Sequence, residues 1–322
     1  MKRAVAVIVS GLLALAAPAI AEEGYPSRPI TMIVPFAPGG STDVIGRVVA
    51  EGLRQVLGQP VVVENRAGAG GSMGTAAIAR ATPDGYTIGI GTASTLAINP
   101  AVYSNLSFDV LGDLTPVGTI ADVPNIMSVN PAVAAADMAS FKTLAGATPG
   151  GLSYASAGIG SVSHLLGEQY RLSSGADIVH VPYKGAGPAL TDVVAGQVEI
   201  LFDNLPTSLP FVRDGKLRAL AVSGEARVAT LPDVPTFAEV GLDEMNWMAF
   251  FALIAPKDMP DALVQKLADA LAAALALPEV AERLAGQQAV LTDSSPQRLR
   301  ERIETEVARM RRAATAAAIS LD

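Results

Sequence analysis

The sequence has no cysteine and only two histidines, His164 and His180. Without thiols the chain cannot form disulfides, use a thiolate nucleophile or bind zinc through sulfur. Two imidazoles are too few for a histidine-rich metal centre, and the phosphate-binding pattern G-x-x-x-x-G-K-[ST] is missing as well. Basic residues are outnumbered, 23 against 31 acidic ones. We therefore expect no metal, no cofactor and no nucleic-acid partner, because an acidic surface repels phosphates.

The first 21 residues have the pattern of an export signal. Positions 2 and 3 are Lys and Arg, positions 4–17 form an apolar run, and Ala-Ile-Ala at 19–21 resembles a cleavage site. An uncleaved anchor would need about 20 apolar residues, and Pro18 interrupts the run sooner. We predict secretion with cleavage after Ala21, which leaves 21 basic residues (23 minus 2) against 31 acidic ones.

After the signal, short β-branched runs alternate with alanine-rich stretches of helical spacing, which is typical of an α/β fold with parallel strands flanked by helices. The expected strands are Ile30–Val34, Val61–Glu64, Thr87–Ile90, Asn125–Val129, Leu152–Ala155, Ile178–Val181, Val198–Phe202, Leu217–Val222 and Met248–Ile254. The expected helices are Asp43–Leu57, Ser72–Ala81, Phe141–Ala147, Ser161–Ser173, Ala186–Ala195, Ser208–Asp214, Asp261–Leu277 and Ser295–Arg312.

A chain of about 300 mature residues suits two lobes better than one. No flexible linker separates them, and two extended, proline-marked stretches, 120–129 and 240–254, are the candidates for chain crossings between the lobes. We therefore expect a signal peptide over 1–21, lobe one from 22–122 and 247–322, and lobe two from 123–246.

Two glycine-rich turns each leave an apolar strand and open a helix. The first runs Pro38-Gly39-Gly40-Ser41-Thr42-Asp43 and the second Ser156-Ala157-Gly158-Ile159-Gly160-Ser161. Helix N-termini leave backbone N–H groups unpaired at the positive end of the helix dipole, and glycine lets an anion approach closely. A polar residue of the first turn could instead simply cap its helix. Two such ends, about 120 residues apart, indicate two lobes that close on one carboxylate.

Two further strand ends carry polar residues. Asp203 and Asn204 follow an apolar strand, and Thr92 lies in Gly91-Thr92-Ala93-Ser94-Thr95 after another. The carboxyl ends of parallel strands open into the ligand crevice of such sheets. An Asx turn into Leu205-Pro206 would also explain the Asp-Asn pair. An ionised Asp203 would repel a carboxylate unless the ligand also brings an ammonium or hydroxyl group.

The segment Gly70-Gly71-Ser72-Met73-Gly74 matches the hydrolase pattern G-x-S-x-G, and Asp84 and His164 follow in the hydrolase order. About seven residues separate the expected strand end at Glu64 from Ser72, whereas a nucleophile elbow turns sharply from strand to helix. A flexible lead into a helix explains the segment better, and a serine hydrolase remains the less favoured alternative.

Motifs spread over the chain resemble those of the extracytoplasmic solute receptors of tripartite tricarboxylate transporters, also called Bug proteins. They are Tyr25-Pro26-Ser27-Arg28-Pro29-Ile30, Val34-Pro35-Phe36-Ala37-Pro38-Gly39-Gly40-Ser41-Thr42-Asp43, Val63-Glu64-Asn65-Arg66-Ala67-Gly68-Ala69-Gly70-Gly71, Pro83-Asp84-Gly85-Tyr86-Thr87, Val181-Pro182-Tyr183-Lys184-Gly185 and Leu231-Pro232-Asp233-Val234-Pro235-Thr236. The resemblance runs from about Tyr25 to the C-terminal helices.

This resemblance implies a periplasmic binding protein, type II-like, with two hinged α/β lobes and no enzymatic activity. Its ligand would be a small carboxylate (a di- or tricarboxylate, an acidic amino acid or an aromatic acid), delivered to membrane permease subunits. The contacts carried over are Phe36, Gly40, Ser41, Thr42 and Asp43 in lobe one, and Ser156, Ala157, Gly160, Ser161 and Asp203 in lobe two. Pro38 removes one possible amide donor. A sensor that presents its closed form to a signalling partner would share these features.

Overall fold

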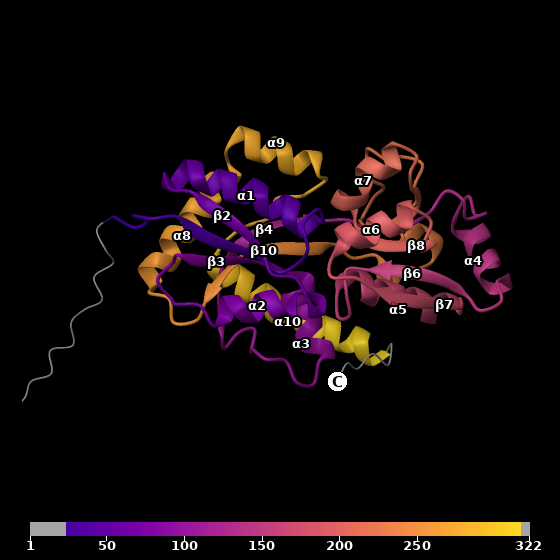
Figure 1. Cartoon of the computed structure of the whole chain (residues 1–322), viewed down its shortest axis with the longest axis horizontal. Coiled ribbons are helices and arrows are strands. Elements are labelled where there is room, and N and C mark those ends of the chain that lie inside the picture. The colour runs from indigo at the N-terminus through magenta and orange to yellow at the C-terminus, as the bar shows by residue number, and fades with distance from the viewer. Residues whose placement is uncertain (1–23, 317–322) are drawn as a thin grey trace, which may run out of the picture.

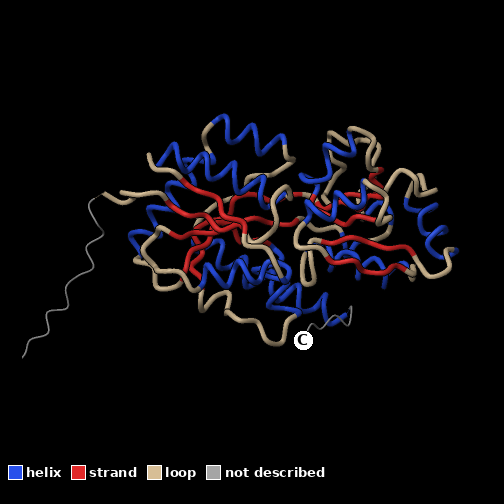
Figure 2. Tube along the Cα trace, in the orientation of Figure 1, coloured by secondary structure: helices blue, strands red, loops and turns tan. Residues whose placement is uncertain are grey.

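The computed structural model describes residues 24–316 and contains two five-stranded mixed sheets, each flanked by helices (Figures 1 and 2). Lobe one is built on the sheet β2-β1-β3-β10-β4, and lobe two on the sheet β7-β6-β8-β5-β9. The proposed signal peptide and its cleavage site lie outside the described residues. The expectation of a two-lobe α/β fold is confirmed.

The strands are β1 (Ile30–Val34), β2 (Val61–Asn65), β3 (Thr87–Thr92), β4 (Leu114–Val123), β5 (Asn125–Val129), β6 (Leu152–Ser156), β7 (Ile178–Pro182), β8 (Ile200–Asn204), β9 (Arg218–Val222) and β10 (Ala249–Pro256). The α-helices are α1 (Ser41–Leu57), α2 (Ser72–Ala79), α3 (Asn99–Val102), α4 (Met138–Ala147), α5 (Val162–Ser174), α6 (Ala186–Val194), α7 (Leu205–Arg213), α8 (Asp261–Leu275), α9 (Pro278–Gly286) and α10 (Pro296–Ala316). A π-helical turn over Ser94–Ile98 precedes α3.

In each sheet the early strands pair in parallel and strands at the crossings pair antiparallel. β1 pairs in parallel with β2 and β3, whereas β10 pairs antiparallel with β3 and β4. In lobe two, β6 pairs in parallel with β7 and β8, and β5 pairs antiparallel with β8 and β9. The chain leaves lobe one between the end of β4 and the start of β5, and returns along β10.

Helix α1 shows why the local pattern predicts this fold. Ile45, Val48, Val49 and Leu53 are buried against lobe one, as their helical spacing indicates. Gly58 ends the helix in the left-handed conformation, with φ 71°. The carboxyl end of β1 therefore leads through a short turn into a helix that packs back on the same sheet, which fixes the turn at the edge facing lobe two (Figure 1).

Three elements differ from the ranges expected from the sequence. β4 begins at Leu114, well before the extended stretch expected from position 120, and α7 begins at Leu205, directly after β8. Helix α9 has no counterpart among the expected ranges, although Pro278 is a residue suited to a helix start and occupies its first position. The C-terminal helix α10 packs on β4, α3 and the π-helical turn, and therefore belongs to lobe one.

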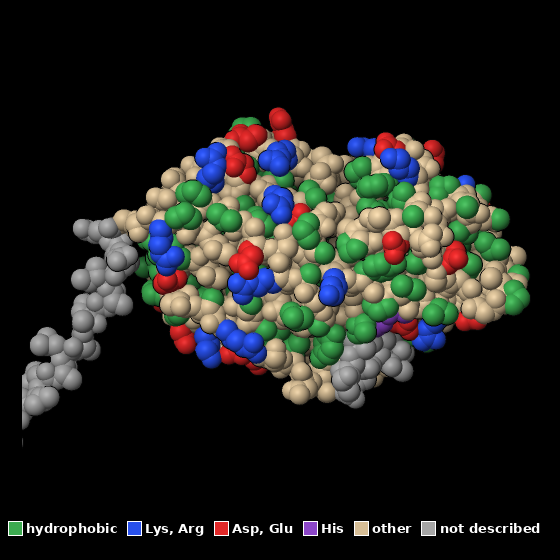
Figure 3. Space-filling view, in the orientation of Figure 1, with side chains coloured by type: hydrophobic (Ala, Val, Ile, Leu, Met, Phe, Trp, Pro, Cys, Tyr) green, Lys and Arg blue, Asp and Glu red, His purple; other side chains and the backbone are tan. Residues whose placement is uncertain are grey.

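Acidic and basic side chains alternate on the surface. Figure 3 shows Lys and Arg beside Asp and Glu over lobe one on the face displayed. Ion pairs such as Arg28 with Asp84 (3.1 Å) and Arg54 with Glu51 (2.7 Å) account for part of this mixing. Within residues 24–316, no helix has the combined length and apolarity needed to cross a membrane.

Candidate functional site between the lobes

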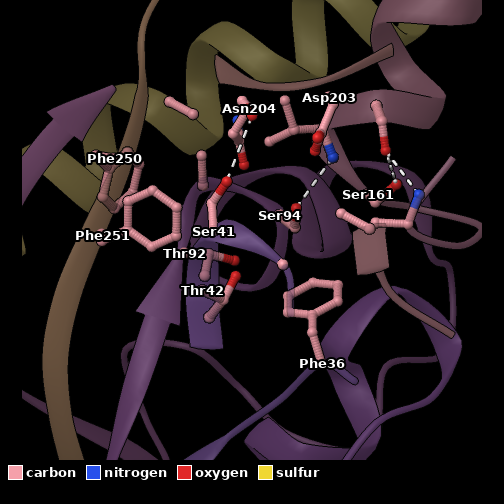
Figure 4. Close-up of a pocket in the computed structure, with 17 residues that line it drawn as sticks. Phe36, Ser41, Thr42, Thr92, Ser94, Ser161, Asp203, Asn204, Phe250 and Phe251 are labelled. Atoms are coloured by element: carbon pink, nitrogen blue, oxygen red, sulfur yellow. Dashed lines mark hydrogen bonds between the residues drawn. The ribbon is translucent and has the colours of Figure 1, made fainter. Parts of the chain in front are cut away.

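A small cavity lies between the two lobes, at the carboxyl ends of strands from both sheets. Its volume is about 30 Å³, room for about two water molecules. The lobe-one wall comes from Phe36, Gly40, Ser41, Thr42, Thr92, Ala93, Ser94, Ala249, Phe250 and Phe251. The lobe-two wall comes from Ala157, Ser161, Val162, Ser163, Ala186, Asp203 and Asn204 (Figure 4). Hydroxyl groups and aromatic rings from the two lobes therefore line one shared cavity.

The first glycine turn brings the N-terminus of α1 to the cavity. Gly40 is the N-cap residue and supplies no side-chain hydrogen bond. Ser41 and Thr42, in the first turn of α1, are both buried at the cavity wall. The N–H of Ser41 donates to the hydroxyl of Thr207 (2.8 Å), and the N–H of Asp43 donates back to the carbonyl of Gly40 (3.0 Å). This end of α1 therefore offers the cavity the positive end of its dipole and the polar residues Ser41 and Thr42.

Asp43 lies behind this turn rather than in the cavity wall. Its carboxylate accepts hydrogen bonds from the N–H of Gly39 (3.1 Å) and the amide of Asn65 (2.9 Å), and pairs with Arg47 at 2.9 Å. Burial alone would raise the pKa of Asp43, but these hydrogen bonds together hold it below its usual value. Asn65 also donates to the carbonyl of Phe36 (3.0 Å), so the network holds the turn in shape.

The second glycine turn is built differently, because its helix carries its own cap. The Ser161 hydroxyl accepts from the N–H of His164 (3.2 Å), as an N-cap residue does. The N–H of Ala157 donates to the hydroxyl of Ser163 (2.8 Å). Ser156 lies beneath the cavity and bonds to His180 Nε2 at 2.6 Å. Gly160 turns its carbonyl to Asn99 of lobe one (2.9 Å).

Asp203, at the carboxyl end of β8, is the acidic residue of the cavity wall. It is 3% exposed, and its carboxylate accepts from the Ser208 hydroxyl at 2.9 Å. Burial raises the pKa of Asp203 to about 7, although hydrogen bonds from Ser208, the backbone of Asn204 and Thr207 oppose the rise. Near neutral pH this carboxyl group can therefore be uncharged and donate a hydrogen bond to a carboxylate, which removes the expected repulsion.

The structure brings most of the predicted contacts together. Eight of them share the cavity wall, namely Phe36, Gly40, Ser41, Thr42, Thr92, Ala157, Ser161 and Asp203. Asp43, Ser156 and Gly160 lie next to the wall and shape it through the bonds described above. Sequence reasoning missed Phe250 and Phe251, because β10 is buried along its whole length and its pattern does not show which residues end at the cavity.

Direct hydrogen bonds join the lobes on both sides of the cavity. On the side of the first turn, Ala37 N–H donates to the carbonyl of Lys184 (3.2 Å), and Ser41 N–H donates to the hydroxyl of Thr207 (2.8 Å). Gly187 lies against the carbonyl of Pro38 so closely that a Cβ atom there would overlap its oxygen.

The side of the second turn is joined in the same way. Tyr103 donates its hydroxyl to the carbonyl of Ile159 (3.1 Å), and the N–H of Val162 donates to the hydroxyl of Ser94 (3.0 Å), the latter drawn in Figure 4. A Cβ atom on Gly70 would overlap the carbonyl oxygen of Ile159. Both flanks of the cavity are thus in direct contact.

The residues of the hydrolase alternative lie in separate surroundings. Ser72 begins α2, after a turn of residues 66–71 that separates it from β2, and Asp84 pairs with Arg28. His164 accepts from the N–H of Gly160 (3.3 Å) and stacks on His180, with ring centroids 4.3 Å apart. This arrangement gives Ser72 no sharp elbow and gives His164 a role in supporting the second turn.

Comparison with known proteins decides the family. The family model described as tripartite tricarboxylate transporter family receptor matches residues 45–318. The chain belongs to this receptor family. It is 41% identical to protein BugT of Bordetella pertussis over 296 residues, which cover 92% of this chain and 90% of BugT. The resemblance found in the sequence motifs is confirmed.

Two solved structures are similar to this receptor along nearly its whole length. An R. palustris protein solved with adipate is 35% identical, with a TM-score of 0.88, 92% of this chain and 99% of that chain being covered. MatC from Rhodopseudomonas palustris, solved with bound malate, is 32% identical with a TM-score of 0.86, covering 90% and 99%. The family is periplasmic, and its members are binding proteins.

Proposed function

We propose that this receptor captures a small carboxylate in the cavity between its lobes and delivers it to the membrane permease of a tripartite transporter. The observation that carries the proposal is the convergence of two helix N-termini, those of α1 and α5, on one small cavity with walls from both lobes. Helix N-termini favour anions through unpaired N–H groups and the helix dipole. The adipate and malate in the similar structures support an acid of this size.

The cavity chemistry supports binding without catalysis. Ser41, Thr42, Ser161 and Thr92 offer hydroxyl groups, and Phe36 adds an apolar wall. Charge-assisted hydrogen bonds contribute about 1.5–3 kcal/mol each, which offsets the cost of removing a carboxylate from water. Four or five of them give a dissociation constant near the micromolar range, about −8 kcal/mol.

Ligand entry requires the lobes to separate. The cavity has room for only about two water molecules, and direct hydrogen bonds join the lobes on both of its flanks. A ligand that contacts both lobes favours the state in which they approach each other. The permease would then recognise the closed, loaded receptor.

We also propose the boundaries expected from the sequence. The export signal would be removed after Ala21, and lobe one would comprise residues 22–122 and 247–322, with 123–246 forming lobe two. The break between β4 and β5 at Pro124 supports the first boundary, and the start of β10 at Ala249 supports the second.

Titration calorimetry of the mature protein tests the proposed function. The panel is adipate, malate, citrate, aspartate and nicotinate, with adipamide as the uncharged control of matched length. We expect at least one acid to bind at about micromolar concentration and adipamide to give no heat. Absence of both heat and thermal stabilisation with every acid at millimolar concentration would contradict the proposal, since a ligand at 100 times its Kd stabilises by about 2.7 kcal/mol.

A further inference from the structure

Each helix that opens from a glycine turn has its first N–H bonded by a hydroxyl of the opposite lobe. In α1, the N–H of Ser41 donates to Thr207 of α7 at 2.8 Å. In α5, the N–H of Val162 donates to Ser94 of lobe one at 3.0 Å. The two contacts are reciprocal, because each lobe supplies a hydroxyl to the helix N-terminus of the other.

Both hydroxyl-bearing residues are almost fully enclosed. Thr207 and Ser94 are each 4% exposed, and Ser41 is 3% exposed. Thr207 also forms a hydroxyl pair with the side chain of Ser41. A hydroxyl acceptor at a first-turn N–H is the contact that an N-cap residue makes within its own helix. When the lobes separate, both helix ends lose these partners to water.

On the side of the first turn, the backbones of the two lobes approach each other closely at a glycine, Gly187. Gly187 lies in α6, in a helical conformation that does not need glycine, and glycine in a helix is unfavourable relative to alanine. The contact that requires its missing side chain is the carbonyl of Pro38 in the other lobe. The glycine at position 187 is therefore explained by the contact between the closed lobes and not by the structure of α6.

We propose that Thr207 and Ser94 are positioning residues that cap the two helices across the cleft and so set how often the lobes are closed before ligand arrives. Closure and helix capping become one event, and the affinity for ligand follows the closed fraction. The inference rests on the proposed function only where a ligand serves as the probe.

The two caps are unequal. Helix α5 also has the Ser161 hydroxyl as its own cap, whereas Gly40 gives α1 no side-chain cap. Removal of the Thr207 hydroxyl therefore leaves α1 without any side-chain cap, and removal of the Ser94 hydroxyl leaves α5 with one. Thr207 should matter more to closure than Ser94.

A distance measurement between the lobes tests this in the absence of ligand. The chain contains no cysteine, so cysteines placed at the exposed Val62 and Val179, on the outer strands β2 and β7, allow specific labelling. The closed-to-open ratio is measured in the otherwise unchanged protein and in Thr207→Val, Thr207→Ser and Ser94→Ala. The matched control is Thr75→Val, because Thr75 is also buried but bonds within lobe one, to the carbonyl of Gly71.

We expect Thr207→Val to lower the closed-to-open ratio about fivefold, the effect of a lost helix cap on an equilibrium. Ser94→Ala should lower the ratio by a smaller factor. Thr207→Ser keeps the hydroxyl group, so this variant and Thr75→Val should both have the ratio of the unchanged protein. An unchanged ratio in Thr207→Val, or the same loss in Thr207→Ser or Thr75→Val, would overturn the inference. If no acid binds but the ratio shifts as expected, the proposed function fails and the inference stands.

Discussion

The N-cap residue of helix α5 is Ser161, whose hydroxyl caps the helix from within its own lobe. The N-cap residue of α1 is Gly40, and α1 receives its side-chain cap from Thr207 across the cleft. The two glycine turns look alike in sequence and occupy equivalent places at the ends of β1 and β6. The second turn has its side-chain cap within its own lobe, whereas the first turn gains a side-chain cap only when the lobes are closed. Equivalent motifs can therefore contribute unequally to a binding site that two lobes share.

The largest expected effect comes from blocking the approach of the lobes on the side of the first turn. Gly187→Ala places a Cβ atom against the carbonyl oxygen of Pro38. We expect ligand affinity to fall about tenfold or more, since the full set of contacts requires closure. Alanine before Pro188 also meets some local strain, so calorimetric affinity, and not melting temperature, is the measurement.

The control for this substitution is Gly146→Ala in α4, where a Cβ atom would meet nothing within 4 Å. This variant should bind ligand like the unchanged protein. Unaltered affinity in Gly187→Ala would mean that the lobes do not need this contact when ligand is bound.

The next effect concerns the charge of Asp203, which has no counterpart in the lobe-one wall. Its pKa of about 7 means that an anionic ligand meets an uncharged group below pH 7 and a carboxylate above it. Affinity for an acid that stays fully ionised between pH 6 and 8 should therefore rise as the pH falls, by at most about tenfold per unit above pH 7.

Asp203→Asn provides the comparison, because an amide keeps the shape and does not titrate. Calorimetry across this range should show a flat profile for the variant. A profile that is equally steep in the variant would assign the pH dependence to another group.

A third prediction uses the fact that both histidines lie in lobe two. Burial, with His164 nearby, lowers the pKa of His180 to about 4. Between about pH 6.5 and 4 the unfolded chain binds a proton that the folded chain does not, so stability falls as the pH drops. Asp203 acts with opposite sign, because its raised pKa makes the folded chain bind more protons and stability falls as the pH rises from about 4 to 7.

Chemical denaturation at several pH values separates the two groups. His180→Gln should remove about 1 to 2 kcal/mol of acid-induced loss, a figure reduced for the partial exposure of the ring. Asp203→Asn should steepen the acid-induced loss instead. Identical pH profiles for the two variants would contradict the assignment.

The smallest effect sharpens the contrast between the turns. Ser161→Ala removes the cap that α5 carries in its own lobe and should cost about 1 kcal/mol of unfolding free energy. The loss should appear in denaturant melts without ligand. A neutral result would indicate that Ser94, bonded to Val162, suffices as the cap of α5.

Much of this site was predictable because local physics determines it. Strand-to-helix turns with glycine mark Gly40 and Ser161 from the sequence alone, and the carboxyl end of a parallel strand marks Asp203. Thr207 was not predictable, since its partner Ser41 is 166 residues away and nothing local in α7 indicates it. Phe250 and Phe251 were not predicted for another reason: every residue of β10 is buried, so the pattern of the strand does not show which of them line the cavity.

A crystal structure of the protein with the acid that binds most tightly tests the central claim most directly. The account predicts that one carboxylate of the ligand lies in the cavity and contacts both the start of α1, at Ser41 or Thr42, and the second turn, at Ala157 or Ser161. An acid held by one lobe only, or bound outside the cavity between the lobes, would contradict it.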